Sequence, residues 1–206
     1  MRTAFKEWAI VVDALGRGDQ IVILRKGGIS EGRGGFKVEQ SRFLLFPTLF
    51  HQQRESVIPS AQERYAEIAP GFPPPERLRL EYWAEVAHVQ KLRSLADAET
   101  LRGQHIWRDE VIAERFEWGR DKSIFALVIR VFRLPQVTEL PMLPAYGGCK
   151  SWIEVDREIE TADSASVLAD AEFEGRLSAF REALEGRKSS GSAGPGVSKL
   201  AGRVAS

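Results

Sequence analysis

Apolar and polar residues near the N-terminus follow the spacing of a helix. Apolar side chains recur every three or four residues along one face: Phe5, Trp8, Ala9, Val12 and Leu15. Gly16 follows them as a stop signal. The pattern predicts an amphipathic helix over residues 3–15, with Trp8 buried on its core face.

Several later segments have the alternation or the β-branched composition of strands. These signals predict strands at residues 20–25, 42–46, from 78 onward, 123–134 and 151–155. The segment SIFALVIRVFRL at 123–134 is long and rich in apolar residues, which makes it the strongest strand signal in the chain. Pro135, Pro141 and Pro144 follow it, and we expect them to hold an extended loop.

Helical signals are interspersed with these strands. Ser60 and Glu63 form a capping-box pair that predicts a helix over residues 61–69. Residues 92–103 have the pattern of a further short helix, whereas residues 106–118 fit a helix or a strand equally. Beyond residue 164, apolar residues on one face predict a helix of about five to six turns: Leu168, Ala171, Phe173, Leu177, Phe180 and Leu184.

This mixture of elements has no regular βαβ rhythm. We therefore expect an α+β fold with a mainly antiparallel sheet, flanking helices and a C-terminal helix. The chain of 206 residues suits one compact domain at 1–160, followed by the amphipathic helix at 161–186. Residues 187–206 are rich in Gly and Ser and predict a disordered tail.

Charge and cysteine content narrow the classes of function. Lys and Arg number 29, as do Asp and Glu, so only a local basic patch could attract a polyanion. Cys149 is the single cysteine, which excludes an internal disulfide and a cysteine zinc cluster. Charges interrupt the apolar N-terminal stretch, so we expect no signal peptide, no membrane span and a cytoplasmic location.

Familiar catalytic motifs are absent from the sequence. Lys150 and Ser151 follow a glycine pair as in a P-loop, but Cys149 stands where that motif needs glycine. The histidines lack the spacing of metal ligands, and no E-x-K or D-x-K occurs to support a metal-dependent nuclease. We therefore predict no cofactor and no transition-metal site. Whether the protein is an enzyme stays open, and so does a magnesium ion held by carboxylates.

Two candidate binding groups follow the ends of predicted strands. The first joins two cations to glycines whose backbone N–H groups are unshielded, which suits a phosphate oxygen: Arg25, Lys26, Gly27 and Gly28. The alternative is a solvated basic turn. The second is His51 with Gln52, which could hydrogen-bond to a base edge or transfer a proton. For this pair the alternative is a backbone cap.

Two further groups lie in the second half of the chain. Trp107 and Arg115 have residue types that stack on unpaired bases, although they are also common in cores. Lys150 and Ser151 follow Gly147 and Gly148, where the backbone can approach a ligand or a neighbouring strand closely. Each group therefore has a structural as well as a functional interpretation.

Several motifs taken together resemble a bacterial family of domains of unknown function, the family numbered eighteen-oh-two. They include FKEWA, FLLFPT, HIW, LVIRVFRLP and YGGCKSW, and they span about residues 4–155, with the C-terminal helix outside. Some members are similar to parts of restriction–modification or other DNA-related systems. The resemblance therefore implies a nucleic-acid context.

A second resemblance is to the ASCH type of PUA-like barrel, which binds RNA or modified bases. Its motif is G-x-K-x-x-E-x-R, of which Gly18 and Arg25 match, while Gln20 and Ile23 replace the lysine and the glutamate. This resemblance implies a partial barrel.

These observations favour a protein that binds nucleic acid, DNA or RNA, or a nucleotide-like ligand. The expected surface comprises Arg25, Lys26, Gly27, Gly28, His51, Gln52 and Lys150. One alternative is an enzyme on a small phosphorylated or nucleic-acid substrate, with His51 as acid/base in a deep pocket. Another is a non-catalytic subunit that docks on a protein partner through an exposed apolar stripe on helix 165–185.

Overall fold

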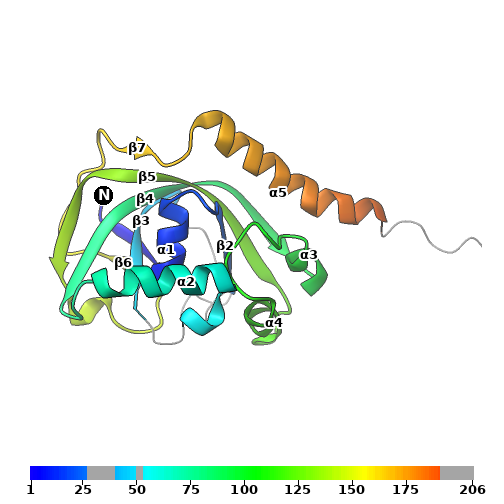
Figure 1. The fold of residues 1–206 in the computed structure, drawn as a ribbon, viewed down its shortest axis with the longest axis horizontal. Helices are drawn as coiled ribbons and strands as arrows, with labels where there is room; N and C mark the ends of the chain where they lie inside the picture. The colour runs from blue at the N-terminus through cyan, green and yellow to red at the C-terminus, as the bar shows by residue number, and fades with distance from the viewer. Residues whose placement is uncertain (27–39, 50–52, 191–206) are drawn as a thin grey trace, which may run out of the picture.

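The computed structural model describes residues 1–26, 40–49 and 53–190, and it has one curved sheet with helices on both sides (Figure 1). The strands are β1 (Thr3–Trp8), β2 (Val22–Arg25), β3 (Arg42–Thr48), β4 (Arg77–Leu92), β5 (Ile124–Pro141), β6 (Trp152–Glu154) and β7 (Ala165–Ser166). The α-helices are α1 (Ala9–Gly16), α2 (Pro59–Ile68), α3 (Leu95–Glu99), α4 (Asp109–Glu117) and α5 (Asp170–Ser190). Short 3-10 turns are η2 (Arg54–Ser56), η3 (Ala69–Gly71) and η4 (Pro144–Tyr146).

The strands are ordered β2-β5-β4-β3-β1-β6, and β7 adds to β5. Only β1 and β3 pair in parallel among the described strands, and the other ladders are antiparallel. The long strands β4 and β5 contain register shifts, and they arch over α1 (Figure 1). The predicted α+β fold with a mainly antiparallel sheet, flanking helices and a C-terminal helix is confirmed.

Both faces of the central strands are buried. Phe5, Phe43 and Leu45 point into the larger core, which contains α1. The residues that alternate with them, Ala4 and Leu44, point into a second core on the opposite face. Alternate side chains of a strand point to opposite faces, so β1 and β3 need apolar residues on both.

The prediction of a helix over residues 3–15 is wrong for its first part. Residues Thr3–Trp8 form β1, and the helix begins only at Ala9. Phe5 and Trp8 of the strand are three residues apart and fall in phase with the apolar residues of α1, so the helical periodicity continues across the boundary. Trp8 is therefore half-buried at the strand end, with φ −60° and ψ 139°, and does not lie on a helix face.

The prediction of a loop after residue 134 is also wrong, because β5 continues to Pro141. Proline is tolerated where a strand needs no ladder N–H, as at a bulge. Arg133 pairs with Tyr82 and Thr138 with Leu80, so the shift between these pairs releases Pro135 from the ladder. The ambiguous segment 106–118 contains the helix α4.

The C-terminal helix α5 packs on the sheet through its first half and extends beyond the body (Figure 1). Phe173, Leu177 and Phe180 belong to the larger core, and Asp170 forms an ion pair with Arg130 on β5. No large apolar side chain of α5 is exposed among those the structure describes. The docking stripe expected on helix 165–185 is therefore not seen there.

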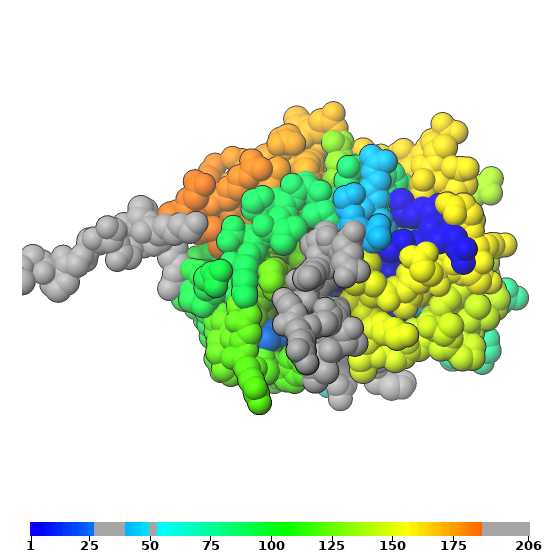
Figure 2. Space-filling view, turned by 180° about the vertical axis from the view of Figure 1, so that it is seen from behind, coloured from blue at the N-terminus to red at the C-terminus, as the bar shows by residue number. Residues whose placement is uncertain are grey.

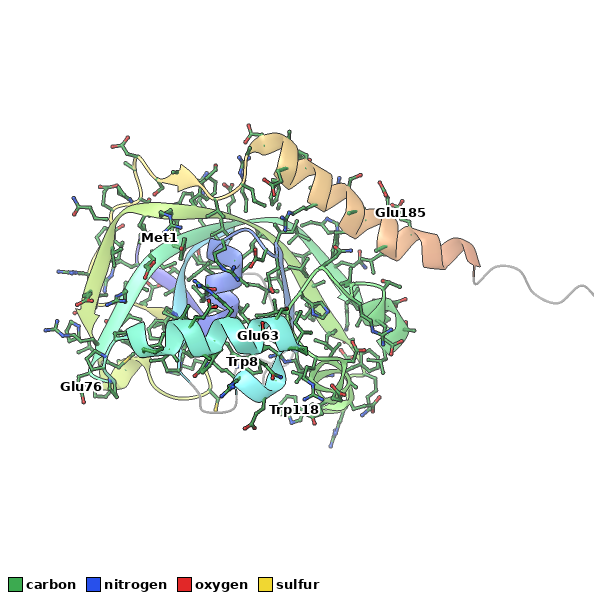
Figure 3. The ribbon with its side chains drawn as sticks, viewed as in Figure 1. Met1, Trp8, Glu63, Glu76, Trp118 and Glu185 are labelled. Atoms are coloured by element: carbon green, nitrogen blue, oxygen red, sulfur yellow. The ribbon has the colours of Figure 1, made fainter. Side chains whose placement is uncertain are left out.

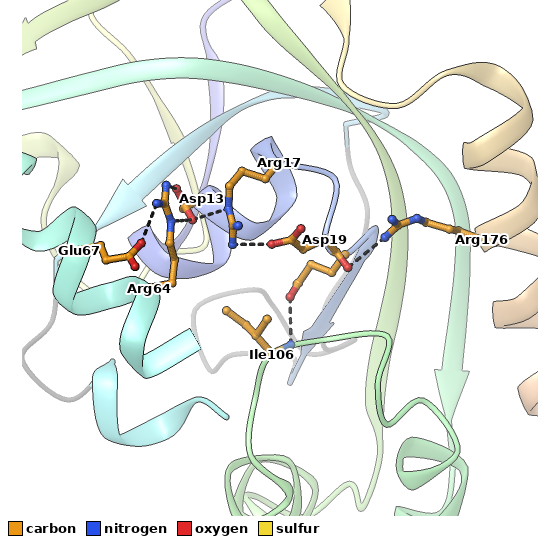
Figure 4. A network of polar contacts seen from close by, with 8 residues as sticks. Asp13, Arg17, Asp19, Arg64, Glu67, Ile106 and Arg176 are labelled. Carbon is orange, nitrogen blue, oxygen red and sulfur yellow. Dashed lines mark hydrogen bonds and ion pairs between the residues drawn. The ribbon is translucent and has the colours of Figure 1, made fainter. Parts of the chain in front are cut away.

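A network of charged residues ties α1 to α2 and to α5 (Figure 4). Asp13 on α1 accepts hydrogen bonds from Arg64 on α2 and from Arg17. Arg176 on α5 donates to the backbone oxygen of Asp19 at 3.0 Å. None of the described helices is long and apolar enough to cross a membrane.

A candidate ligand cleft

A cleft of about 1180 Å³ opens between the α2–η3 segment and the loop that contains η4. Its apolar and aromatic wall includes Trp8, Phe46, Ile68, Phe72, Tyr82, Met142, Leu143 and Tyr146. Its polar residues include Lys6, Glu7, Asp13, Arg25, Arg77, Arg79 and Lys150. The cleft therefore combines a large apolar surface with a concentration of cations.

The parallel pairing of β1 and β3 brings one end of the cleft together. In this register Trp8 pairs with Thr48 and Lys6 pairs with Phe46, so β1 and β3 terminate at the same end of the sheet. The hydroxyl of Thr48 donates to the backbone oxygen of Glu7 at 3.0 Å. Seen from behind, the first residues of the chain lie beside the yellow segment that includes β6 (Figure 2).

Arg25, at the end of β2, is oriented from three sides. Its Nη2 donates to the Ser151 hydroxyl at 2.7 Å, and its Nη1 lies 3.8 Å from Oε2 of the buried Glu7. Its guanidinium carbon stands 5.0 Å from the centre of the Phe5 ring. The side chain keeps 22% of its surface exposed, so the guanidinium is fixed yet still reaches the cleft.

Lys6 and Lys150 add two more positive charges to this end. The Lys6 ammonium donates to the backbone oxygens of Tyr146 and Gly148, at 2.8 and 2.9 Å. Burial lowers the pKa of Lys6, and the neighbouring charges of Arg25 and Lys150 lower it further, while Cys149 acts in the opposite sense. Lys150 is exposed, and no described carboxylate lies within ion-pair distance of it. We call Lys6, Arg25 and Lys150 the cationic end.

Trp107 and Arg115 lie in the core beside this cleft and do not line it. Arg115 lies between the Trp8 and Trp107 rings, 4.9 Å from each centre, and donates to the Leu24 backbone oxygen at 2.9 Å. Burial lowers the pKa of Arg115 to about 10. Trp107 is 1% exposed, and this geometry favours the structural interpretation of both residues.

The remaining sequence candidates are separated from the cleft or lie outside the described residues. The Lys26 ammonium donates to the backbone oxygens of Phe116, at 3.0 Å, and of Asp121, beyond the end of α4. Lys26 therefore joins β2 to α4. Gly27, Gly28, His51 and Gln52 all lie outside the described residues, so the acid/base hypothesis for His51 stays a prediction.

The structure thus brings together Arg25, Lys150 and Ser151 from the predicted set. Sequence reasoning missed Lys6, Glu7 and Trp8, which lie next to one another in FKEWA. Assigning this segment to a helix turned Lys6 and Glu7 into ordinary surface charges. In this segment Ala4 and Lys6 alternate with Phe5 and Glu7, as they would on the two faces of a strand. This alternation was the signal in the sequence for a strand with one charged residue on each face.

Three of the four residues at the ASCH-motif positions, Gly18, Gln20 and Ile23, have structural roles in this chain. Gln20 is buried, donates to the Val22 backbone oxygen at 2.8 Å and accepts the Ile106 N–H at 3.1 Å. Ile23 is fully buried in the larger core. Gly18 has φ +76°, a left-handed conformation that glycine adopts readily. Only Arg25 reaches the cleft from this segment.

The family model described as "Domain of unknown function (DUF1802)" matches residues 4–179, which extends the match expected from sequence into α5. The ASCH protein from Zymomonas mobilis is 11% identical in its crystal structure, with a TM-score of 0.42, over 85% of this chain and 93% of that one. A mutant of the same protein gives 12% identity and a TM-score of 0.40, over 85% and 96%. No curated protein matched.

Proposed function

This chain belongs to the DUF1802 family of domains of unknown function, and from its cleft we propose that it binds a single-stranded nucleic acid or a nucleotide-like ligand. The observation that carries the proposal is the cationic end: Lys6, Arg25 and Lys150 converge beside an apolar and aromatic cleft. The chain as a whole has no net charge, so this local concentration of cations is the feature that would attract a polyanion.

The cationic end suits a phosphate group. Arg25 offers a planar set of N–H donors, already oriented by Ser151 and Phe5. Lys150 can turn its exposed ammonium towards the same anion. The mutual repulsion of Lys6 and Lys150 is relieved when a negative charge lies between them, which is why an anion would stabilise this arrangement.

The apolar wall suits an unpaired base. Trp8 and Phe72 are half-buried aromatic residues of the wall, and aromatic side chains stack on bases whatever the sequence. The cleft volume of about 1180 Å³ exceeds that of typical small-molecule sites, about 300–1,000 Å³. There is thus room for a nucleotide with part of a strand. A base paired in a duplex has both faces stacked and could not enter such a cleft.

The test is a salt titration of binding with labelled single-stranded RNA, single-stranded DNA and duplex DNA. The parent should bind a single strand more tightly than duplex. Lys150→Ala should weaken single-strand binding and reduce the salt slope by up to about 0.7 per lost phosphate contact. Arg181→Ala is the matched control, because Arg181 is an exposed cation on α5, and no described α5 residue lines the cleft. It should leave both quantities unchanged.

Three results would contradict the proposal. One is that the parent binds none of these nucleic acids even at low salt. Another is that Lys150→Ala and Arg181→Ala weaken binding equally, because a diffuse surface charge would then suffice. Preferential binding of duplex DNA would exclude the cleft as the site.

A further inference from the structure

Glu7 presents an anomaly in the wall of the cleft. Its side chain is fully buried, and its Oε1 accepts the N–H of Trp8 at 2.8 Å. Its Oε2 has no hydrogen-bond partner within the described structure. Buried polar atoms are almost always hydrogen-bonded, so a buried carboxylate oxygen without a donor requires a physical explanation.

Glu7 is a counter-ion to Arg25 and Arg115, but this role leaves Oε2 without a hydrogen-bond donor. Arg25 is the nearest cation, but its Nη1 lies 3.8 Å from Oε2, beyond hydrogen-bond distance. The same guanidinium instead donates to the Ser151 hydroxyl at 2.7 Å. Arg115 donates to a backbone oxygen. Oε2 is therefore ion-paired with Arg25 without a hydrogen bond, and it retains its capacity to accept one.

We propose that Glu7 is a specificity-determining residue that accepts a hydrogen bond from the exocyclic amino group of a nucleobase in the cleft. This inference rests on the proposed function, since it names the class of base that the same cleft takes. Adenine, cytosine and guanine carry such an amino group, and uracil and thymine lack it. A carboxylate is a suitable acceptor for this donor.

Uracil does not satisfy the same acceptor equally well. Its ring N–H is flanked by carbonyl oxygens, which would be brought close to the carboxylate and repel it. An amino group offers a donor at the rim of the base. Because the Glu7 side chain is fully buried, the base edge reaches Oε2 only if Arg25 gives up its 3.8 Å contact with Glu7, and its 2.7 Å hydrogen bond to Ser151 can persist when it does. The phosphate and the base would then be recognised side by side.

The test uses short uridine oligonucleotides that carry one central adenosine, cytidine or guanosine. At least one of these should bind the parent about tenfold more tightly than the all-uridine strand. Replacing that nucleoside by its counterpart without the amino group should abolish the gain. The counterparts are purine riboside for adenosine, pyrimidin-2-one riboside for cytidine and inosine for guanosine. These ligand-side comparisons need no protein variant.

The protein-side test compares Glu7→Gln with the parent. The variant should bind the amino-bearing and the all-uridine strands within about twofold of each other, with all-uridine binding retained. Glu63→Gln is the matched control, because Glu63 is exposed on α2 (Figure 3) and does not line the cleft. It should keep the preference. Should Glu7→Gln fail to fold, Glu7→Asp keeps the negative charge while withdrawing the oxygen by one methylene, and should lose the preference too.

The outcomes separate this inference from the proposed function. If the parent binds every strand equally, the role of Glu7 is overturned while nucleic-acid binding stands. The same holds if a folded Glu7 variant keeps the preference. If no strand binds at low salt, the proposed function itself has failed. If neither variant folds, equal binding of the strands with and without the amino group overturns the inference.

Discussion

The guanidinium of Arg64 on α2 contacts both carboxylate oxygens of Asp13 on α1, with Nη2–Oδ1 at 2.9 Å and Nε–Oδ2 at 3.0 Å. Two parallel hydrogen bonds of this kind fix orientation as well as distance. Asp13 also lines the cleft, as does Ile68 at the end of α2. The pair therefore sets how α2 is placed beside the cationic end.

We predict that Asp13→Asn lowers the free energy of unfolding by about 1–2 kcal/mol, because charge-assisted hydrogen bonds to Arg64 and Arg17 are weakened together. Urea denaturation followed by circular dichroism measures the change. Glu67→Gln is the control, because Glu67 contacts the same Arg64 but is 67% exposed. Its loss should cost less than about 1 kcal/mol. If the two changes lower the free energy of unfolding equally, the hydrogen bonds of Asp13 stabilise the fold no more than the exposed ion pair of Glu67 does.

Gly18 gives a prediction about backbone and packing together. Its φ of +76° disfavours any other residue, and an added Cβ would lie 2.4 Å from Cδ2 of Leu168. Gly18→Ala should therefore destabilise the fold by about 1–3 kcal/mol. Gly175→Ala is the matched control, because Gly175 lies in α5 with open space around it. That change should stabilise the protein by about 0.5–1 kcal/mol. A thermal melt of both variants decides, and similar melting temperatures would contradict the prediction.

His105 should make stability depend on pH. Burial lowers the pKa of His105 to about 4, against about 6.5 in the unfolded chain. Between these values the unfolded state binds more protons, so stability should fall as the pH falls from 6.5 towards 4. The full effect is about 3 kcal/mol. His105→Gln should flatten this part of the profile of unfolding free energy against pH, relative to the parent. An unchanged slope would exclude His105 as the cause.

Local sequence signals predicted an element correctly where its own hydrophobic pattern determines its structure. The helix predicted at 61–69 corresponds to α2, and the strand predicted at 20–25 contains β2. The capping box expected at Ser60 is wrong, because α2 begins at Pro59 with Ile58 as its N-cap and no side chain caps it. Errors arose where tertiary structure overrides the local signal. The spacing of Phe5 and Trp8 in β1 imitated a continuation of α1, and the bulge around Pro135 allowed proline inside β5.

The candidate site was predictable only in part, for a geometric reason. Arg25, Lys150 and Ser151 were chosen because their local chemistry suits an anion. The hydrogen bond between Arg25 and Ser151 joins residues 126 positions apart in the sequence, and no local pattern predicts it. The role of Glu7 depends on which hydrogen bonds its oxygens lack, which only the packed structure can reveal.

The position of β1 between β3 and β6 determines the order in which the sheet can be completed during synthesis. Thr3 pairs with Glu154, so this strand must wait for its second neighbour until most of the chain has left the ribosome. Until then one edge of an apolar strand has unpaired N–H and C=O groups, which favours association with other chains. Folding of this protein should therefore be slow, governed by a contact between segments distant in sequence, and sensitive to chaperones that shield the nascent N-terminal strand.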